Sequence, residues 1–256
     1  QLRRAAAISV LAHRRAMRQC RPGMYEYQLE AELNHEFAIR GAREPAYPSI
    51  VAGGANACTM HYIDNHTRLK RGDLVLIDAG GEYRNYAADI TRTFPVSGRF
   101  TRRQRQLYEL VLAAQEAAFA QLYPGQSWNA AHEASVDVIC AGLVQLGLLR
   151  GEESELRARE AHKQFYMHRV GHWLGLDVHD VGDYRLGGAW RTLEPGMVLT
   201  VEPGLYIRPG DESVESAWWG LGVRIEDNVV ITDAGFELLT TGLPRTVREI
   251  EDWMCH

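Results

Sequence analysis

The sequence is poor in cysteine, has no excess of basic residues and contains no long apolar run. Its four cysteines form no CxxC pair, which argues against a disulfide framework and against a thiolate metal site. Lysine and arginine total 28 against 33 acidic residues, a formal net charge of -5, so there is no basic footprint for nucleic acid. No apolar run approaches the roughly 20 residues of a membrane helix, and no signal-peptide core follows the first residues. We therefore expect a cytoplasmic globular protein that binds neither nucleic acid nor a membrane.

Apolar periodicity, with glycine and proline as stop signals, predicts four helices and four strands. The predicted helices cover residues 1–20, 25–40, 102–122 and 128–149. The predicted strands cover residues 73–79, 87–96, 196–202 and 222–232. The segment 165–182 is rich in histidine and glycine and is expected to be a loop or an irregular strand. No structure is assigned to the tail from residue 242.

A weak internal repeat divides the chain into halves of about 1–100 and 101–256. The segments 72–80 and 196–204 both begin and end in glycine and both carry a carboxylate at the seventh position, Asp78 and Glu202. In each half a second strand follows with another carboxylate, Asp89 and Glu226. The repeat predicts two pseudo-symmetric halves that each give two carboxylates to a shared centre.

These carboxylates stand where burial is costly. Asp78 ends an apolar run, where an unpaired buried acid is destabilising, although capping of the next turn would also explain it. Asp89 lies in a strand that can fold back against the first, and like charges that close need a cation or a proton. Arg224 and Glu226 share one face of a strand, where a surface ion pair is the alternative interpretation.

Three histidines, His168, His172 and His179, fall within twelve residues, and His61 stands alone. A spacing of four resembles helical zinc motifs, but the segment lacks the Glu of HExxH and its glycines oppose a regular helix. A site role is predicted for the cluster. Four carboxylates and one imidazole suit a pair of Mn²⁺, Mg²⁺, Co²⁺ or Zn²⁺ ions, which together activate water and polarise a carbonyl. A Cys58/His61 nucleophile pair is the alternative chemistry.

Five segments carry a resemblance to a known family. The strings HYIDN (61–65), LVLIDAGGEYRNYAADITRTFPVSGRFT (74–101), HRVGHWLGLDVHDVG (168–182), LEPGMVLTVEPGLYI (193–207) and GLGVRIEDNVVIT (220–232) resemble the Xaa-Pro aminopeptidases. These belong to the pita-bread metallopeptidases, with prolidase and methionine aminopeptidase. The resemblance implies an α/β (α+β) pita-bread fold, in which two pseudo-symmetric αβ halves form a curved, mostly antiparallel sheet covered by helices.

The resemblance also implies a role for each site residue. The metal ligands would be Asp78, Asp89, His172, Glu202 and Glu226, with Asp89 and Glu226 bridging two ions, usually Mn²⁺. The residues that contact substrate, move protons or orient ligands would be His61, His168, His179, Glu202 and Arg224. Glu202 is the expected proton shuttle, and His179 the expected hydrogen-bond donor to the tetrahedral oxyanion.

The implied reaction is hydrolysis that removes the first residue from peptides with proline second. An Xaa-Pro dipeptidase is the alternative with the same chemistry, and a non-catalytic binding domain is the alternative from another class. Relatives usually carry a separate N-terminal domain, which we expect to be absent from these 256 residues. A homo-oligomer is compatible with the resemblance.

Overall fold

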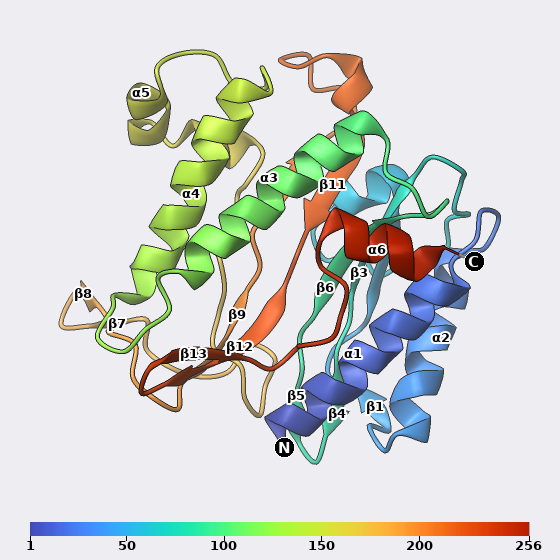
Figure 1. Cartoon of the computed structure of the whole chain (residues 1–256), viewed down its shortest axis with the longest axis horizontal. Helices are drawn as coiled ribbons and strands as arrows, with labels where there is room; N and C mark the ends of the chain where they lie inside the picture. Colours follow the sequence, from blue (N-terminus) through green and yellow to red (C-terminus); the bar gives the residue numbers. More distant parts are fainter. Residues whose placement is uncertain (256) are drawn as a thin grey trace.

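Two pairs of helices lie on the outside of a set of antiparallel strands (Figure 1). The computed structural model describes residues 1–255. In the first half, α1 (Leu2–Gln19) packs along α2 (Glu26–Ile39). In the second half, α3 (Arg102–Phe119) packs along α4 (Trp128–Gln145). These four helices confirm the predicted ones to within a few residues at each end, where assignments ordinarily differ.

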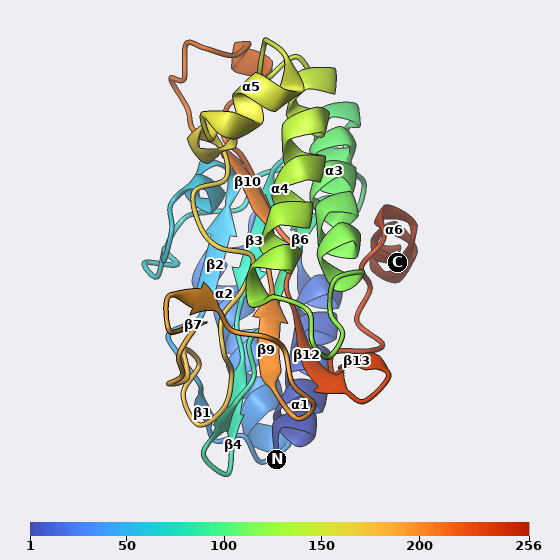
Figure 2. The same ribbon diagram turned by 90° about the vertical axis from the view of Figure 1, so that its left-hand side faces the viewer.

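The helices form where small or apolar residues recur on one face. In α1 the alanines at 5, 12 and 16 are fully buried, while its arginines lie on the outer face. Helix α3 starts at a capping box, in which the Thr101 and Gln104 side chains each bond the other's backbone N–H. Figure 2 shows the strands running between the two helix pairs.

The first half places an apolar strand at the middle of a three-stranded sheet. β3 (Leu74–Asp78) pairs with β2 (Ile50–Gly53) on one side and β6 (Thr91–Pro95) on the other, all antiparallel. Residues 74–77 are buried, so the apolar run is explained by a strand covered on both faces. The register pairs Asp78 with Thr91. β1 (Glu44–Pro45), β4 (Gly81–Tyr83) and β5 (Tyr86–Ala87) form a separate small sheet.

The second half repeats this arrangement around β9 (Val198–Val201). β9 pairs with β12 (Asp227–Thr232), which pairs with β13 (Gly235–Leu238). On its other side the segment 170–174 runs along β9, with Thr200 N bonded to His172 O and Glu202 N to Val170 O. The expected irregular strand therefore lies here, although only one isolated bridge, Trp173 with Leu199, counts as sheet pairing.

The remaining elements are short. They are a 3-10 turn η1 (Gly54–Cys58), β7 (Arg185–Leu186), β8 (Ala189–Trp190), β10 (Gly204–Ile207), β11 (Leu221–Arg224), α5 (Glu153–Ala158), η2 (Ala161–Gln164), η3 (Ser216–Trp218) and α6 (Val247–Met254). β7 and β8 form a hairpin, and β10 pairs with β11. The tail without an assigned structure contains α6, which begins at a Thr246–Glu249 capping box.

Two predicted strands are wrong in their continuity. The strand 87–96 is interrupted between β5 and β6, and the strand 222–232 is interrupted between β11 and β12. Asp89 and Glu226 lie in these interruptions, where the backbone leaves the ladder. At the second break Glu226 N donates to Thr91 O, so the two halves are joined there. Within residues 1–255, no helix is both long and apolar enough to cross a membrane.

Candidate metal centre

Asp78 and Asp89 meet at the end of β3. Asp78 is the last residue of that strand, and Asp89 follows the small β4–β5 hairpin, which returns the chain toward β3. The Tyr47 hydroxyl lies 2.6 Å from Asp78 Oδ1 and 2.5 Å from Asp89 Oδ1. A phenol has a single proton, so it can donate to only one of these carboxylates at a time. Each carboxylate also has a second neighbour, Arg224 for Asp78 and His172 for Asp89.

Glu226 brings a third carboxylate to the same place from the other half. Its Oε2 accepts a 2.7 Å hydrogen bond from the Thr91 hydroxyl, and the side chain is 1% exposed. Its Oε1 is buried and has no hydrogen-bond partner. A buried carboxylate oxygen left in this way costs free energy, because it has lost water and gained nothing. The orphaned oxygen is therefore suited to a ligand such as a metal ion.

His172 completes a compact set of potential ligand atoms. Its Nδ1 lies 2.9 Å from Trp173 O, an arrangement in which Nδ1 carries the proton and Nε2 faces the carboxylates. Nε2 is 3.2 Å from Asp89 Oδ2 and 3.4 Å from Glu202 Oε1. One ligand atom from each of Asp89, His172 and Glu226 lies within 4.8 Å of the others. Glu202 directly follows β9, as Asp78 ends β3.

The electrostatics of this cluster favour a bound cation. Burial, with repulsion from neighbouring carboxylates, raises the pKa of Glu226 well above its usual value and raises the pKa of Glu202 to about 7. Burial also raises the pKa of Asp89. Burial opposes protonation of His172, but Asp89 and Glu202 outweigh it and raise the pKa of His172 to about 9. Crowded carboxylates that would otherwise hold protons fit divalent ions, which replace those protons.

Arg224 connects the cluster to His168. Its Nη2 donates to Asp78 Oδ2 at 2.5 Å, and its Nη1 donates to the Tyr206 hydroxyl at 2.9 Å. That hydroxyl lies 2.9 Å from His168 Nε2, while His168 Nδ1 lies 2.8 Å from Arg169 O. Burial, with the nearby charge of Arg224, lowers the pKa of His168 to about 3. His168 is therefore neutral, and its Nε2 accepts from Tyr206.

His179 and His61 lie at the rim rather than in the cluster. The His179 ring contacts the His172 ring edge-on, with centroids 4.3 Å apart, and both rim histidines are exposed. They line two hollows. The smaller, of about 320 Å³, also contains Tyr47, Asp78 and Asp89. The larger, of about 640 Å³ and called the groove below, is also lined by His172 and Glu202.

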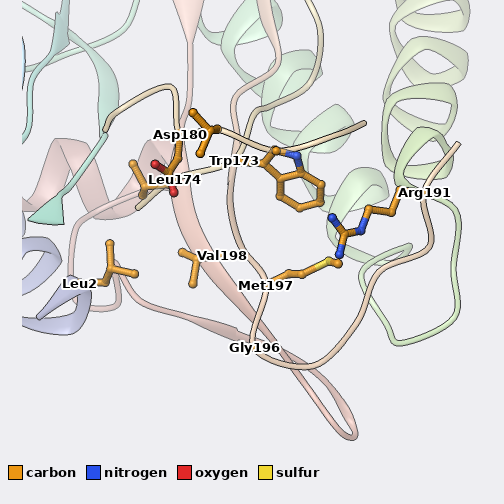
Figure 3. Close-up of a pocket in the computed structure, with 10 residues that line it drawn as sticks. Leu2, Trp173, Leu174, Asp180, Arg191, Gly196, Met197 and Val198 are labelled. Carbon is orange, nitrogen blue, oxygen red and sulfur yellow. The ribbon is translucent and has the colours of Figure 1, made fainter. Parts of the chain in front are cut away.

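A third hollow, of about 300 Å³, is lined by Trp173 and Leu174, the two residues that follow His172 (Figure 3). Figure 3 shows Trp173 and Met197 beside it, with Leu2 on the far side. The face of Trp173 stacks on Tyr184 with centroids 5.5 Å apart, and Tyr184 lines the 640 Å³ groove. The stacked pair therefore connects the lining of the third hollow to that of the groove and joins the two ends of the segment 173–184.

Sequence reasoning missed three side chains that hold the ligands. Tyr47, Tyr206 and Thr91 each bond one or more of the predicted residues, but none stands beside a ligand in sequence except Thr91, two residues after Asp89. Thr91 could have been found from strand alternation, because residues two apart share a face. The two tyrosines had no such signal. The Arg224–Glu226 surface ion pair does not form, since Arg224 is buried and pairs with Asp78.

The chain is similar to known proteins over nearly its whole length. The family description "Metallopeptidase family M24" matches residues 1–233. The chain is 53% identical to Xaa-Pro aminopeptidase of Escherichia coli K12 over 99% of its length and 57% of the relative's. It aligns with the structure of Pseudomonas aeruginosa aminopeptidase PepP at a TM-score of 0.98 and 61% identity, covering 99% of this chain and 57% of that one. A zinc-substituted E. coli aminopeptidase P in complex with product aligns at 0.96 and 52% identity, with the same coverage.

The resemblance predicted from five sequence segments is thereby confirmed, and so is the pita-bread fold of mixed helices and antiparallel sheets. The chain spans a little over half the length of these relatives. With a family match that covers most of its residues, this protein belongs to metallopeptidase family M24.

Proposed function

We propose that this chain carries the catalytic centre of a metal-dependent aminopeptidase that removes the first residue from peptides with proline second. The observation that carries the proposal is the convergence of Asp89, His172 and Glu226 from both halves, with one buried Glu226 oxygen unpartnered. Asp78 is linked to Asp89 through the Tyr47 hydroxyl, and Glu202 lies 3.4 Å from His172. The identity to Xaa-Pro aminopeptidase over nearly the whole chain supplies the proline preference.

Two divalent ions would be held by these five residues. Asp78 and Asp89 would contribute from the first half of the chain, and His172, Glu202 and Glu226 from the second. We propose Mn²⁺ as the metal, with Co²⁺, Zn²⁺ or Mg²⁺ as substitutes, since oxygen-rich sets accept all of them. When bound, such a pair lowers the pKa of water and polarises the scissile carbonyl.

The protein's own residues would position the peptide and move the proton. We propose Glu202 as the proton shuttle because its carboxylate lies 3.4 Å from His172 Nε2 and lines the 640 Å³ groove, where a peptide can reach it. It would take the proton of the attacking water and deliver it to the proline nitrogen. Like any amide nitrogen, the proline nitrogen must gain a proton in order to leave as an amine. His179 and His61, on the rim of both hollows, would contact the carbonyl oxygen and the proline ring.

Arg224 would act by holding Asp78 rather than by touching substrate. It is 4% exposed and donates to Asp78, Tyr206 and Thr91. The planar guanidinium fixes all three acceptors at once, which a lysine could not do. Its contact with Tyr206 also sets the hydrogen bond that His168 accepts, so the orientation of that ring depends on Arg224.

The test is hydrolysis of Ala-Pro-Ala, Ala-Pro and Ala-Ala-Ala with Mn²⁺ and after chelation. We expect release of alanine from Ala-Pro-Ala, loss of activity on chelation, and little cleavage of Ala-Ala-Ala. Cleavage of Ala-Pro alone would instead identify an Xaa-Pro dipeptidase. No cleavage of any peptide and no bound metal would overturn the proposal in favour of a binding domain.

We also propose a cytoplasmic location and a homo-oligomer. All four cysteines are free thiols and three are buried, which fits a reducing compartment. On the segment that follows His172, Leu176 and Val181 expose 57% and 86% of their area, and contact with another subunit would bury this apolar surface. Light scattering during gel filtration tests the assembly, and a monomeric mass would reject it.

A further inference from the structure

The 640 Å³ groove joins the candidate centre to a pair of arginines. Its lining includes His172 and Glu202 and also Arg169, Arg185 and Trp190. Arg169 lies one residue after His168, whereas Arg185 and Trp190 face each other across the β7–β8 hairpin. The volume lies within the range of pockets that bury small ligands. A peptide bound at the centre can therefore extend along this groove to the hairpin.

The two guanidinium groups are held on one indole and lack an acidic partner. The Arg185 and Arg169 Cζ atoms lie 4.0 Å and 4.7 Å from the Trp190 ring centroid, within cation–π distance. Arg169 also donates to Asn129 Oδ1. Among residues 1–255 neither arginine forms an ion pair, even though Asp183 lines the same groove. Burial lowers the pKa of Arg169, and the positive charge of Arg185 lowers it further. The nearby Tyr166 and Glu133 act in the opposite direction but are outweighed.

Two positive groups fixed side by side without a counter-ion favour an anionic ligand. Guanidinium groups bind carboxylates in a planar, two-pronged arrangement, and stacking on Trp190 reduces the entropy lost on binding. The other hollow has the opposite character, since Asp78 and Asp89 line it. The charged ends of a peptide therefore have matching places: the amino end beside the carboxylates, and a carboxylate beside the arginines.

We propose that Arg169 and Arg185, supported by Trp190, form a carboxylate-binding subsite for the part of the substrate that follows proline. This inference rests on the proposed aminopeptidase function. The ligand is a carboxylate, supplied either by the free C-terminus of a short peptide or by an acidic side chain downstream of proline. The subsite makes short acidic peptides better substrates than their amidated or neutral counterparts.

The experiment compares peptides that differ only in that carboxylate, using the Mn²⁺-loaded protein. One pair is Ala-Pro-Ala as the free acid and as the C-terminal amide. The second pair is Ala-Pro-Glu amide and Ala-Pro-Gln amide, which isolates a side-chain carboxylate. An acid-over-amide preference in the first pair identifies the C-terminus as the source, and a preference in the second pair identifies the side chain.

Arg185→Gln is the main variant, because the backbone of Arg169 also positions His168. We expect about a five-fold rise in KM for the favoured acid peptide, the size typical of a solvent-exposed ion pair, with little change in kcat. The acid-to-amide ratio of kcat/KM should fall toward one. Arg185→Lys should restore part of it, and added salt should lower the ratio of the wild type. Arg248→Gln, at a 91% exposed side chain on α6, is the matched control and should leave the ratio unchanged.

Equal kcat/KM for acid and amide peptides in the wild type would overturn the subsite, and so would an undiminished ratio in Arg185→Gln. If the wild type cleaves none of the peptides, the aminopeptidase proposal fails instead. In that case calorimetric titration with the uncleaved Ala-Pro-Ala acid and amide decides the subsite, and equal Kd values would reject it.

Discussion

The buried ion pair between Arg92 and Asp227 should be the strongest single support of the candidate centre. Arg92 Nη2 lies 2.7 Å from Asp227 Oδ1, and the two side chains are 1% and 0% exposed. Arg92 Nη1 also donates to Glu226 O at 2.7 Å. Asp227 Oδ1 accepts from Thr240, and its Oδ2 accepts from Gln115 at 3.0 Å. The pair therefore fixes the backbone on both sides of Glu226.

Asp227→Asn should destabilise the fold by about 3–5 kcal/mol, because it leaves the Arg92 charge buried without compensation. The amide cannot escape this by rotating. One of its ends must present an N–H either to Arg92 or to Gln115, and both of these are donors. Since small proteins have total stabilities of about 5–15 kcal/mol, the loss is a large share of the whole.

Urea unfolding followed by tryptophan fluorescence measures this loss. Asp252→Asn is the control, because the Arg248–Asp252 pair is exposed and 3.6 Å apart, and we expect its free energy of unfolding to match the wild type. The double variant Arg92→Met/Asp227→Leu removes both charges together and should be more stable than Asp227→Asn. It should remain less stable than the wild type, because Glu226 O and the Gln115 amide lose their partners. A loss below about 1 kcal/mol in Asp227→Asn would refute the assignment of a buried, charged pair.

Four further predictions concern the centre and its surroundings. Glu226→Ala should abolish turnover and lower the number of Mn²⁺ ions bound, measured by calorimetry; retained activity would contradict the two-metal assignment. Glu202→Gln should lower kcat by at least about 10²-fold with an unchanged melting temperature, if it moves the proton. His13 is buried, and burial lowers its pKa from 6.5 to about 4. Folding therefore favours the neutral imidazole, so the contribution of His13 to stability is complete above pH 6.5 and is lost as the pH falls toward 4. Between pH 7 and pH 5, the free energy of unfolding measured in urea should fall by about 2 kcal/mol more in the wild type than in His13→Gln. Gly171→Ala would place a Cβ 2.0 Å from Thr200 O, so it should displace the neighbouring His172 and reduce both melting temperature and activity. If the variant instead melts at the temperature of the wild type, the segment can adjust to the added methyl group.

The helices and the two central strands could be predicted from sequence because their signals are local. The alanine-rich face of α1 and the apolar run of β3 each have the periodicity of the element they form. Glycine and proline mark where these elements end. The strand breaks at Asp89 and Glu226 could not be predicted in this way, since both lie within continuous β-forming sequence. The ladder stops there because the chain turns toward contacts in the other half, such as Glu226 N with Thr91 O.

The identity of the site residues followed from pattern, whereas their partners did not. The glycine-bounded repeat indicated that Asp78 and Glu202 hold equivalent positions, and the paired acids implied a cation. Tyr47, more than thirty residues from both aspartates it contacts, has no local signature of that role. Asp227 reads as one more acid beside Glu226, and only its burial with Arg92 reveals a structural function.

The sequence by itself determined which chemical groups this protein can bring to a centre, namely four carboxylates and a histidine, and the order of the strands that present them. Tertiary structure alone decided which oxygen of each carboxylate is bonded, which is orphaned, and that two arginines share one indole beside the groove. The physical reason is that ligand identity is a property of single residues, while distance and burial depend on register and packing between segments over a hundred residues apart. The Thr91–Glu226 contact, across a sequence separation of 135, is one such case.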